Sequence, residues 1–192
     1  MVAALQAAAG ALADAGAVVE PFRTPALDER DWQVLTLAIW GAEGGAFLAP
    51  LLAGREAELS ENIRRRSQLA RASFDEYLAA LAACDSLRAE MAAAMRRFDL
   101  IVCPLTPLPA PPHDLREYQV AGKSVPARHM VRATVPWNIT GQPALAVPWQ
   151  LSADGLPIAA QVVGRLGDDA AVLRAGLVLE AAAPMRGKRP PL

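Results

Sequence analysis

The chain has 192 residues, enough for one domain with a sizeable buried core, and a formal net charge of −1. That balance excludes the strongly basic surface that recruits nucleic acid or an anionic membrane. Two cysteines, Cys84 and Cys103, lack metal-site spacing and the density of a secreted disulfide scaffold, so we expect two core thiols in a cytoplasmic protein. No signal peptide is evident and no apolar run approaches about 20 residues, so the sequence predicts no membrane span.

The first 20 residues predict a helix followed by a strand. Residues 2–15 are rich in alanine and place Val2, Leu5 and Leu12 on one helical stripe. Gly16 is expected to end the helix, and residues 17–20 to form a short apolar strand. A helix followed by a strand is the second half of a βαβ unit, so we expect this helix to cover a sheet.

Two further helices are expected before residue 73. One begins at Leu27 with Asp28 as its N-cap, and Gly44-Gly45 weakens its end. Residues 55–72 are charged and predict a helix, in which the Arg64-Arg65-Arg66 run is a solvated face rather than a phosphate site, because acidic residues adjoin it.

A long helix and a buried strand follow. Ser73-Phe74-Asp75-Glu76 is a capping-box signature, and apolar residues then recur at spacings of three and four as far as Phe98. Residues 99–104 predict a buried strand. The proline-rich residues 105–112 exclude regular structure, because proline lacks the backbone N–H that helices and sheets need.

The next segment predicts an exposed connection and a short helix. Residues 113–124 form the connection, in which Gly122-Lys123-Ser124 is not a phosphate loop, because Glu117 stands where the first glycine is required. Residues 126–135 predict the helix, which Pro136 should end.

The C-terminal third predicts a buried hairpin. The apolar runs Ala144–Pro148 and Ile158–Val163 flank a turn at Asp154-Gly155, which suits the positive φ of tight turns. Residues 138–143 are expected to be a polar loop before the first strand. After the hairpin, Asp168 or Asp169 caps a final helix through about residue 182.

The stretch from Asn138 to Arg165 resembles the C-terminal region of the amidase signature family. The shared order is Asn-x-Thr-Gly-x-Pro-Ala-Leu-x-Val-Pro, then Asp-Gly-Leu-Pro, then Gln-x-x-Gly-Arg, with Gln150 and Ala159 standing where the family favours glycine. The resemblance implies an α/β fold, with a mixed β-sheet flanked by helices on both faces. Residues 1–183 would be the C-terminal portion of a single amidase-type domain, and residues 184–192 a loose C-terminal tail.

The resemblance implies hydrolysis of carbon–nitrogen amide bonds by a Ser–cis-Ser–Lys triad that belongs to the family's N-terminal half. The six serines here lie in no Gly-Ser-Ser or G-x-S-x-G context, and neither Lys123 nor Lys188 lies in an apolar setting that would lower its pKa. We therefore expect no catalytic residue in this chain. His113 and His129 lack partners at ligand spacing, so no metal is expected, and no cofactor is implied.

The resemblance also implies substrate-binding positions. In relatives, the positions ten, seven and three before the conserved asparagine line the acyl-binding pocket, and here they are Arg128, Val131 and Val135. On a helix of residues 126–135 these three would share one face. Glutamine-using relatives carry an acidic residue where Val131 stands, so an apolar or aromatic acyl group is favoured. The alternatives are a solvent-exposed Arg128 and ordinary core positions for both valines.

Two more positions have an implied role with a structural alternative. Thr106 belongs to a loop similar to the family's Pro-Thr-x-Pro loop, which borders the active-site region, although a rigid structural loop would look the same. Arg88 matches an arginine that reaches the substrate in some relatives, but a salt bridge is the expected role.

The expected partners are a small-molecule amide substrate in the complete enzyme and the N-terminal half of the same enzyme. No nucleic acid and no membrane are expected. The alternative function is a non-catalytic remnant or interaction module with an amidase-like fold. Part of a glutamine-dependent amidotransferase A-type subunit is less favoured, because Val131 is not acidic.

Overall fold

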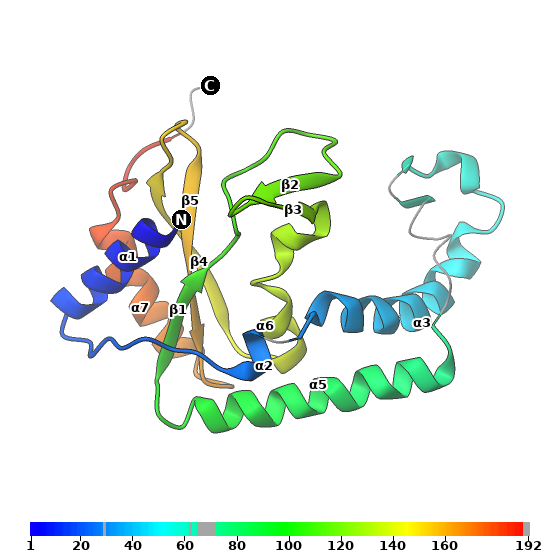
Figure 1. The fold of residues 1–192 in the computed structure, drawn as a ribbon, viewed down its shortest axis with the longest axis horizontal. Coiled ribbons are helices and arrows are strands. Elements are labelled where there is room, and N and C mark those ends of the chain that lie inside the picture. Colours follow the sequence, from blue (N-terminus) through cyan, green and yellow to red (C-terminus); the bar gives the residue numbers. More distant parts are fainter. Residues whose placement is uncertain (29, 62, 65–71, 190–192) are drawn as a thin grey trace.

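The computed structural model describes residues 1–28, 30–61, 63–64 and 72–189. In chain order, its elements are the helices and 3-10 turns α1 (Val2–Asp14), α2 (Pro25–Asp28), α3 (Trp32–Leu52), η1 (Glu56–Glu58) and α5 (Phe74–Ala94), the strands β1 (Leu100–Pro104), β2 (Glu117–Val120) and β3 (Lys123–Pro126), then η2 (Ala127–Val131), α6 (Val135–Thr140), β4 (Ala144–Leu151), β5 (Pro157–Gly164) and α7 (Asp169–Ala182). Figure 1 shows their arrangement.

The main sheet has three strands in the order β1-β5-β4. Both of its pairings are antiparallel, and a register shift interrupts the β4–β5 pairing between Pro148 and Gln150. The predicted hairpin is confirmed: β4 and β5 are joined by a turn in which Gly155 has a φ of 77°. That left-handed conformation favours glycine, which has no Cβ to clash.

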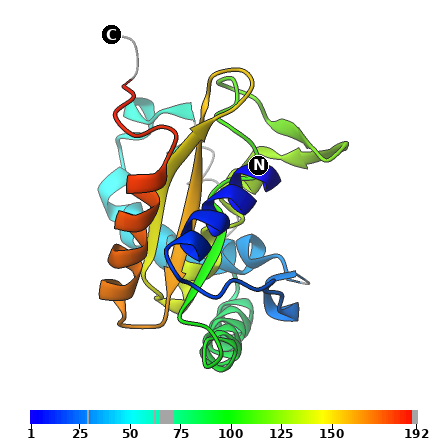
Figure 2. The ribbon, with the colours of Figure 1, turned by 90° about the vertical axis from the view of Figure 1, so that its left-hand side faces the viewer.

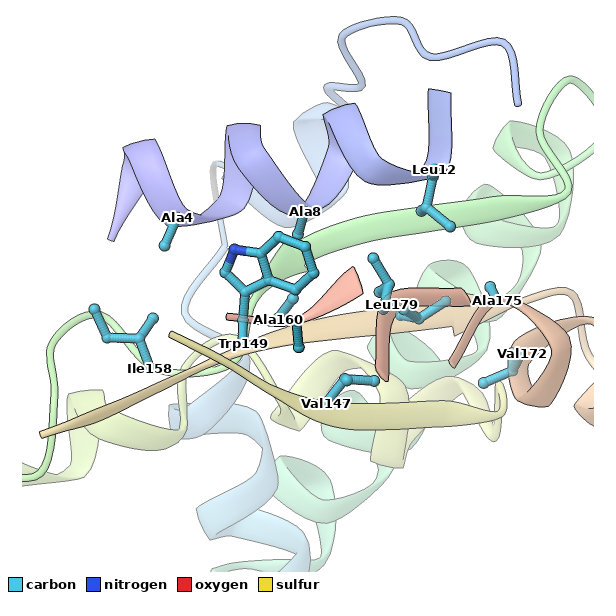
Figure 3. Close-up of a cluster of buried hydrophobic side chains, with 12 residues drawn as sticks. Ala4, Ala8, Leu12, Val147, Trp149, Ile158, Ala160, Val172, Ala175 and Leu179 are labelled. Carbon is cyan, nitrogen blue, oxygen red and sulfur yellow. The ribbon is translucent and has the colours of Figure 1, made fainter. Parts of the chain in front are cut away.

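Helices cover both faces of this sheet, as expected for the α/β class (Figure 2). On one face, α1 and α7 pack against β4 and β5 in a cluster that includes Leu12, Val147, Trp149 and Leu179. Figure 3 shows Ala4 and Ala8 of α1 above Trp149. The predicted stripe of α1 is thus partly wrong: Val2 is exposed, while the small Ala4 and Ala8 are buried against the indole.

On the opposite face, α5, α6 and the start of α3 form a second cluster, which includes Trp32, Leu87, Met91 and Trp137. The capping box of α5 is confirmed, because Ser73 Oγ accepts from the Glu76 backbone N–H at 3.2 Å and the Glu76 carboxylate accepts from the Ser73 N–H at 2.7 Å. The long helix that these residues start runs along one side of the molecule beside α3 (Figure 1).

The predicted strand at residues 17–20 is wrong. These residues have no regular structure, and Val18 is 96% exposed. An isolated apolar run becomes a strand only where a neighbouring strand pairs with it, and this segment instead crosses from α1 to α2. The βαβ interpretation of the N-terminus fails with it, while the prediction that α1 covers a sheet is confirmed.

The second predicted helix differs in both of its ends. Asp31 rather than Asp28 caps α3, since its carboxylate accepts from the Gln33 backbone N–H at 3.1 Å. The helix continues through Gly44-Gly45 and contains Pro50. Much of the helix predicted at 55–72 lies outside the described residues. Within the described part, Glu56–Glu58 form the short 3-10 turn η1.

Helix α3 also bears on the membrane prediction. By length and composition alone, this helix is long and apolar enough to cross a membrane. Mostly buried core helices of soluble proteins and signal sequences also have such length and composition, and the apolar window of α3 is not buried. The absence of a membrane span therefore stays a prediction.

Two differences concern the segments before and after the main hairpin. Residues expected to be a plain connection form the β2–β3 hairpin. Pro136, expected to end a helix, instead lies in the first turn of α6, where its missing N–H costs no hydrogen bond. Residues 138–140, expected to be loop, therefore belong to α6, which ends at Gly141 with a φ of 73°.

Candidate functional site

A cavity of about 280 Å³ lies at the C-terminal end of β1. The segments that line it are far apart in the sequence: α2 and the start of α3, the end of β1 with the proline-rich loop, and the stretch from η2 into α6. Its lining is mostly apolar, with two side chains that can be cationic and one amide; the residues are Leu27, Trp32, Gln33, Cys103, Pro104, Pro107, His129, Arg132, Ala133, Pro136 and Trp137. A concave apolar site with a few polar groups is the usual form of a small-molecule site.

Hydrogen bonds fix the wall contributed by α3. Trp32 Nε1 donates to the backbone oxygen of Ala26 at 2.7 Å, which holds the indole at the start of the helix. Gln33 Nε2 donates to the backbone oxygen of Arg128, so α3 and η2 are joined directly. Both side chains are buried, and a buried amide keeps its position through such bonds.

Gln161 of β5 joins two other segments of the lining, at Cys103 and Ala133. Its Nε2 donates to the backbone oxygen of Ala133 at 2.9 Å and contacts Cys103 Sγ at 3.1 Å. Burial raises the pKa of the Cys103 thiol, against opposing effects of Gln161 and Trp137. The Trp137 Nε1 atom is buried and makes no regular hydrogen bond among the described residues, so its effect on the sulfur is that of a weak contact. Cys103 is therefore a protonated wall residue at neutral pH.

The charged groups of the cavity come from η2 and the residue after it. The pKa of His129 is lowered, first by burial and then by the charges of Arg132 and Arg128, while Asp31 acts in the opposite direction. His129 is thus mainly neutral at pH 7. Arg132 is half-buried. Among the residues that line the cavity, Arg132 is the cation at neutral pH.

The structure separates the four predicted substrate-binding residues. Val131 is 50% exposed, whereas Val135 is 8% exposed and packs in the second core cluster. Arg128 is exposed, and it is its backbone oxygen that accepts the hydrogen bond from Gln33 Nε2. Thr106 Oγ1 donates to the backbone oxygen of Leu108 at 2.8 Å within its own loop, so the loop reaches the cavity through Pro104 and Pro107 instead.

The predicted shared face of Arg128, Val131 and Val135 does not form. Residues 127–131 are a 3-10 turn, and α6 begins as a separate helix at Val135. A 3-10 turn has three residues per turn, so the spacing of an α-helix does not apply to it. The two segments still lie next to each other at the cavity, since His129, Arg132 and Pro136 line it.

A second cavity, of about 440 Å³, lies between the C-terminal half of α5 and the residues that follow α6 and β5. Arg88 lines it and makes the expected salt bridge, with its Nη1 at 2.6 Å from Asp85 Oδ1. Its Nε also donates to the backbone oxygen of Ile139 at 2.9 Å. Gln142 Nε2 donates to the backbone oxygen of Gly164 at 2.8 Å. The Arg88 bond joins α5 to the segment around the Thr-Gly motif, and the Gln142 bond joins that segment to the end of β5.

The serine hydroxyls of the described residues bond to backbone groups or to Glu76 and Glu117, and the structure pairs none of them with a lysine or histidine in this part of the chain. No group of three histidine, cysteine or acidic residues placed to hold a metal ion occurs in the described ranges. Ser67 lies outside them. A serine nucleophile needs a base within hydrogen-bond distance, and the described serines have no lysine or histidine there.

Most of the cavity-lining residues carry no signal in the sequence. His129 has the pattern of an ordinary surface histidine, and no motif assigns a site role to Trp32, Arg132 or Trp137. Trp137 adjoins Asn138 of the recognised motif, which is the one local signal that could have indicated it. The others meet only through tertiary packing, which no spacing in the sequence reveals.

The fold first defines a class, that of the amidase-signature folds. A solved protein described as the crystal structure of amidase superposes with a TM-score of 0.82 and 27% identity, covering 94% of this chain and 41% of that chain. The family model described as Amidase matches residues 1–173. The chain belongs to the Amidase family.

Two curated relatives are similar to parts of this chain. The 6-aminohexanoate-cyclic-dimer hydrolase of Pseudomonas sp. (strain NK87) is 33% identical over 105 residues, which is 50% of this chain and 21% of the relative. The A-type subunit of the glutamyl-tRNA(Gln) amidotransferase of Oceanobacillus iheyensis is 33% identical over 101 residues, which is 51% of this chain and 19% of the relative. The matched part of the chain spans about a fifth of the length of these relatives.

Proposed function

We propose that the chain is the C-terminal segment of an amidase, an enzyme that hydrolyses carbon–nitrogen amide bonds through a Ser–cis-Ser–Lys triad outside this chain. Its role is to complete the sheet and to form one wall of the acyl-substrate pocket. The observation that carries the proposal is the cavity at the end of β1, which lies in a chain that matches the Amidase family over residues 1–173. Residues 1–183 act as part of one domain, and residues 184–192 as its tail.

Such a wall contributes to hydrolysis by positioning the substrate. Hydrolysis needs the acyl carbon held against the nucleophile, and a rigid apolar surface holds the acyl group while keeping bulk water away. Trp32, Pro136 and Trp137 supply that surface, and hydrogen bonds from Gln33 and Gln161 keep its two sides in place. The exposed Val131 and Arg128 would lie toward the N-terminal half of the enzyme, and Thr106 at the loop that borders it.

The first test is an assay for amide hydrolysis by the isolated 192-residue chain on simple aryl and aliphatic amides. The proposal predicts no turnover, because the described serines lack an activating base. Adding an N-terminal half with the triad should give hydrolysis that the isolated chain lacks. Turnover by the chain alone that vanished on mutation of one of its six serines would contradict the proposal.

The second test is Val131→Asp in a complete enzyme that carries this segment. A carboxylate there would be desolvated by an apolar acyl group, so KM for apolar amides should rise at least tenfold while the fold remains intact. Val18→Asp is the matched control, because Val18 is likewise exposed but lies on the loop between α1 and α2 rather than in η2. An unchanged KM in folded Val131→Asp would remove Val131 from the pocket.

Two alternatives lead to different results in these tests. A non-catalytic remnant or interaction module would give no hydrolysis even with an N-terminal half present. A glutamine-dependent amidotransferase A-type subunit would release ammonia from glutamine, but Val131 offers no carboxylate for the substrate amine. The proposal names a small-molecule amide and the N-terminal half as partners, with neither nucleic acid nor membrane, and a cytoplasmic location.

A further inference from the structure

We propose that the cavity at the end of β1 takes an acyl group that carries its own terminal carboxylate, and that Arg132 binds this carboxylate. The inference rests on the proposed function, since it names the class of amide that the same site accepts. Such substrates are monoamides of dicarboxylic acids, in which an apolar chain separates the scissile amide from the acid.

The first support is the charge of the lining. Arg132 lines the cavity, and no acidic residue does so in the described part of the chain. The structure gives Arg132 no ion pair with a described carboxylate, although other arginines have one, such as Arg30 with Glu90 and Arg165 with Asp99. A half-buried guanidinium without an internal anion favours an anionic ligand, because the charge-assisted pair replaces hydration that the apolar surroundings reduce.

The second support is the position of Asp31, the acidic residue whose charge reaches His129. Its carboxylate is occupied as the N-cap of α3, where it accepts from the Gln33 backbone N–H at 3.1 Å. Asp31 does not line the cavity. The site thus keeps its positive charge at neutral pH, with His129 neutral because burial and Arg132 lower its pKa.

The third support is the remainder of the lining, which suits the apolar part of such a substrate. Trp32, Pro107 and Trp137 present rings and a loop edge around the space, and the volume of about 280 Å³ lies near the lower end of the range for small-molecule sites. An apolar chain in contact with these side chains, with one anionic end at Arg132, satisfies both parts of the lining. Arg128 is not among the lining residues, so Arg132 is the residue to test.

The test is ligand binding to the 192-residue chain, with glutaric acid monoanilide and its carboxamide analogue as probes. Trp32 and Trp137 line the cavity, so intrinsic fluorescence reports occupancy without any need for turnover. We expect the carboxylate to bind at least tenfold more tightly than the carboxamide, with a preference that weakens as salt is added. Arg132→Gln should remove the preference, and Arg132→Lys should keep part of it.

Arg174→Gln is the matched control, because Arg174 is exposed on α7 and away from the cavity lining. Thermal unfolding of each variant confirms that it folds. The inference is overturned if the carboxylate fails to bind, binds no better than the carboxamide, or keeps its preference in folded Arg132→Gln. Hydrolysis assays on the complete enzyme are independent: amide turnover without a carboxylate preference leaves the proposed function standing and removes only this inference.

Discussion

Gln161 Nε2 donates to the backbone oxygen of Ala133 at 2.9 Å, which ties the middle strand of the sheet to the segment between η2 and α6. Gln161 is 2% exposed, so this is a polar side chain inside the core. The same amide contacts Cys103 Sγ at 3.1 Å, and both Cys103 and Ala133 line the cavity. One side chain of β5 therefore sets the distance between two parts of the candidate site.

Replacing Gln161 with leucine should lower the free energy of unfolding by about 1–3 kcal/mol, because the Ala133 carbonyl loses its donor in a buried place. Urea unfolding monitored by circular dichroism measures the change. Gln119→Leu on the exposed face of β2 is the control, with an expected change within about 0.5 kcal/mol. Equal stability of the two variants would show that the buried bond contributes nothing.

Gly176 and Gly10 form a matched pair for helix packing. A Cβ at Gly176 of α7 would collide with Leu145 Cδ2 of β4, whereas a Cβ at Gly10 of α1 meets nothing within 4 Å. Gly176→Ala should therefore destabilise the protein by about 1–3 kcal/mol through overpacking. Gly10→Ala should stabilise it by about 0.5–1 kcal/mol, since alanine favours helix. Thermal unfolding of both variants tests the opposite signs, and a shared sign would contradict the packing of α7 on β4.

Local chemistry explains which elements the sequence could predict. The β4–β5 hairpin followed from two apolar runs around Asp154-Gly155, and the start of α5 from Ser73 with Glu76, because turn and cap residues act on their immediate neighbours. The Asp168 cap of α7 is confirmed in the same way, with its carboxylate accepting from the Ala171 N–H at 3.1 Å. The family could also be identified from the sequence, because the motif from Asn138 to Arg165 keeps its order along the chain.

The wrong predictions have a different cause. Where a segment can adopt more than one secondary structure, tertiary contacts decide which one forms. Residues 17–20 have strand-like composition but no strand beside them. Pro136 suits either the end of one helix or the first turn of the next, and packing of α6 on α5 favours the second. The cavity joins Trp32 with Trp137 and Arg132 across most of the chain, so its lining could not be read from any single motif.

His129 should make stability depend on pH. Its pKa is lowered from the ordinary 6.5, first by burial and then by Arg132 and Arg128. As the pH falls, His129 is therefore protonated in the unfolded chain before it is protonated in the folded chain. The free energy of unfolding should fall as pH decreases from about 7 to 5. His129→Asn should flatten this dependence, whereas His113→Asn at an exposed position should leave it unchanged. Urea unfolding at several pH values measures it, and an identical pH profile for the wild type and His129→Asn would contradict the prediction.

The exposed side of α3 should make the isolated chain associate. Six large apolar side chains of this helix are exposed: Val34, Leu37, Trp40, Phe47, Leu48 and Leu51. Trp40 is 61% and Phe47 71% exposed, and contiguous apolar surface of this kind drives association because its contact with water is unfavourable. We expect sedimentation to show species larger than the monomer and a hydrophobic dye to bind.

The double variant Trp40→Ser/Phe47→Ser should reduce both signals severalfold, since it removes the two largest side chains of the patch while leaving the buried Trp32 in place. Val18→Ser is the control, because Val18 lies on the loop between α1 and α2, where Val19 is the neighbouring exposed side chain, and not on the exposed face of α3. A wild-type chain that sediments as a clean monomer without dye binding would show that this face of α3 needs no cover. Equal association of the double variant and Val18→Ser would instead shift the cause to the unpaired edges of β1 and β4, which this three-stranded sheet leaves open in the described residues.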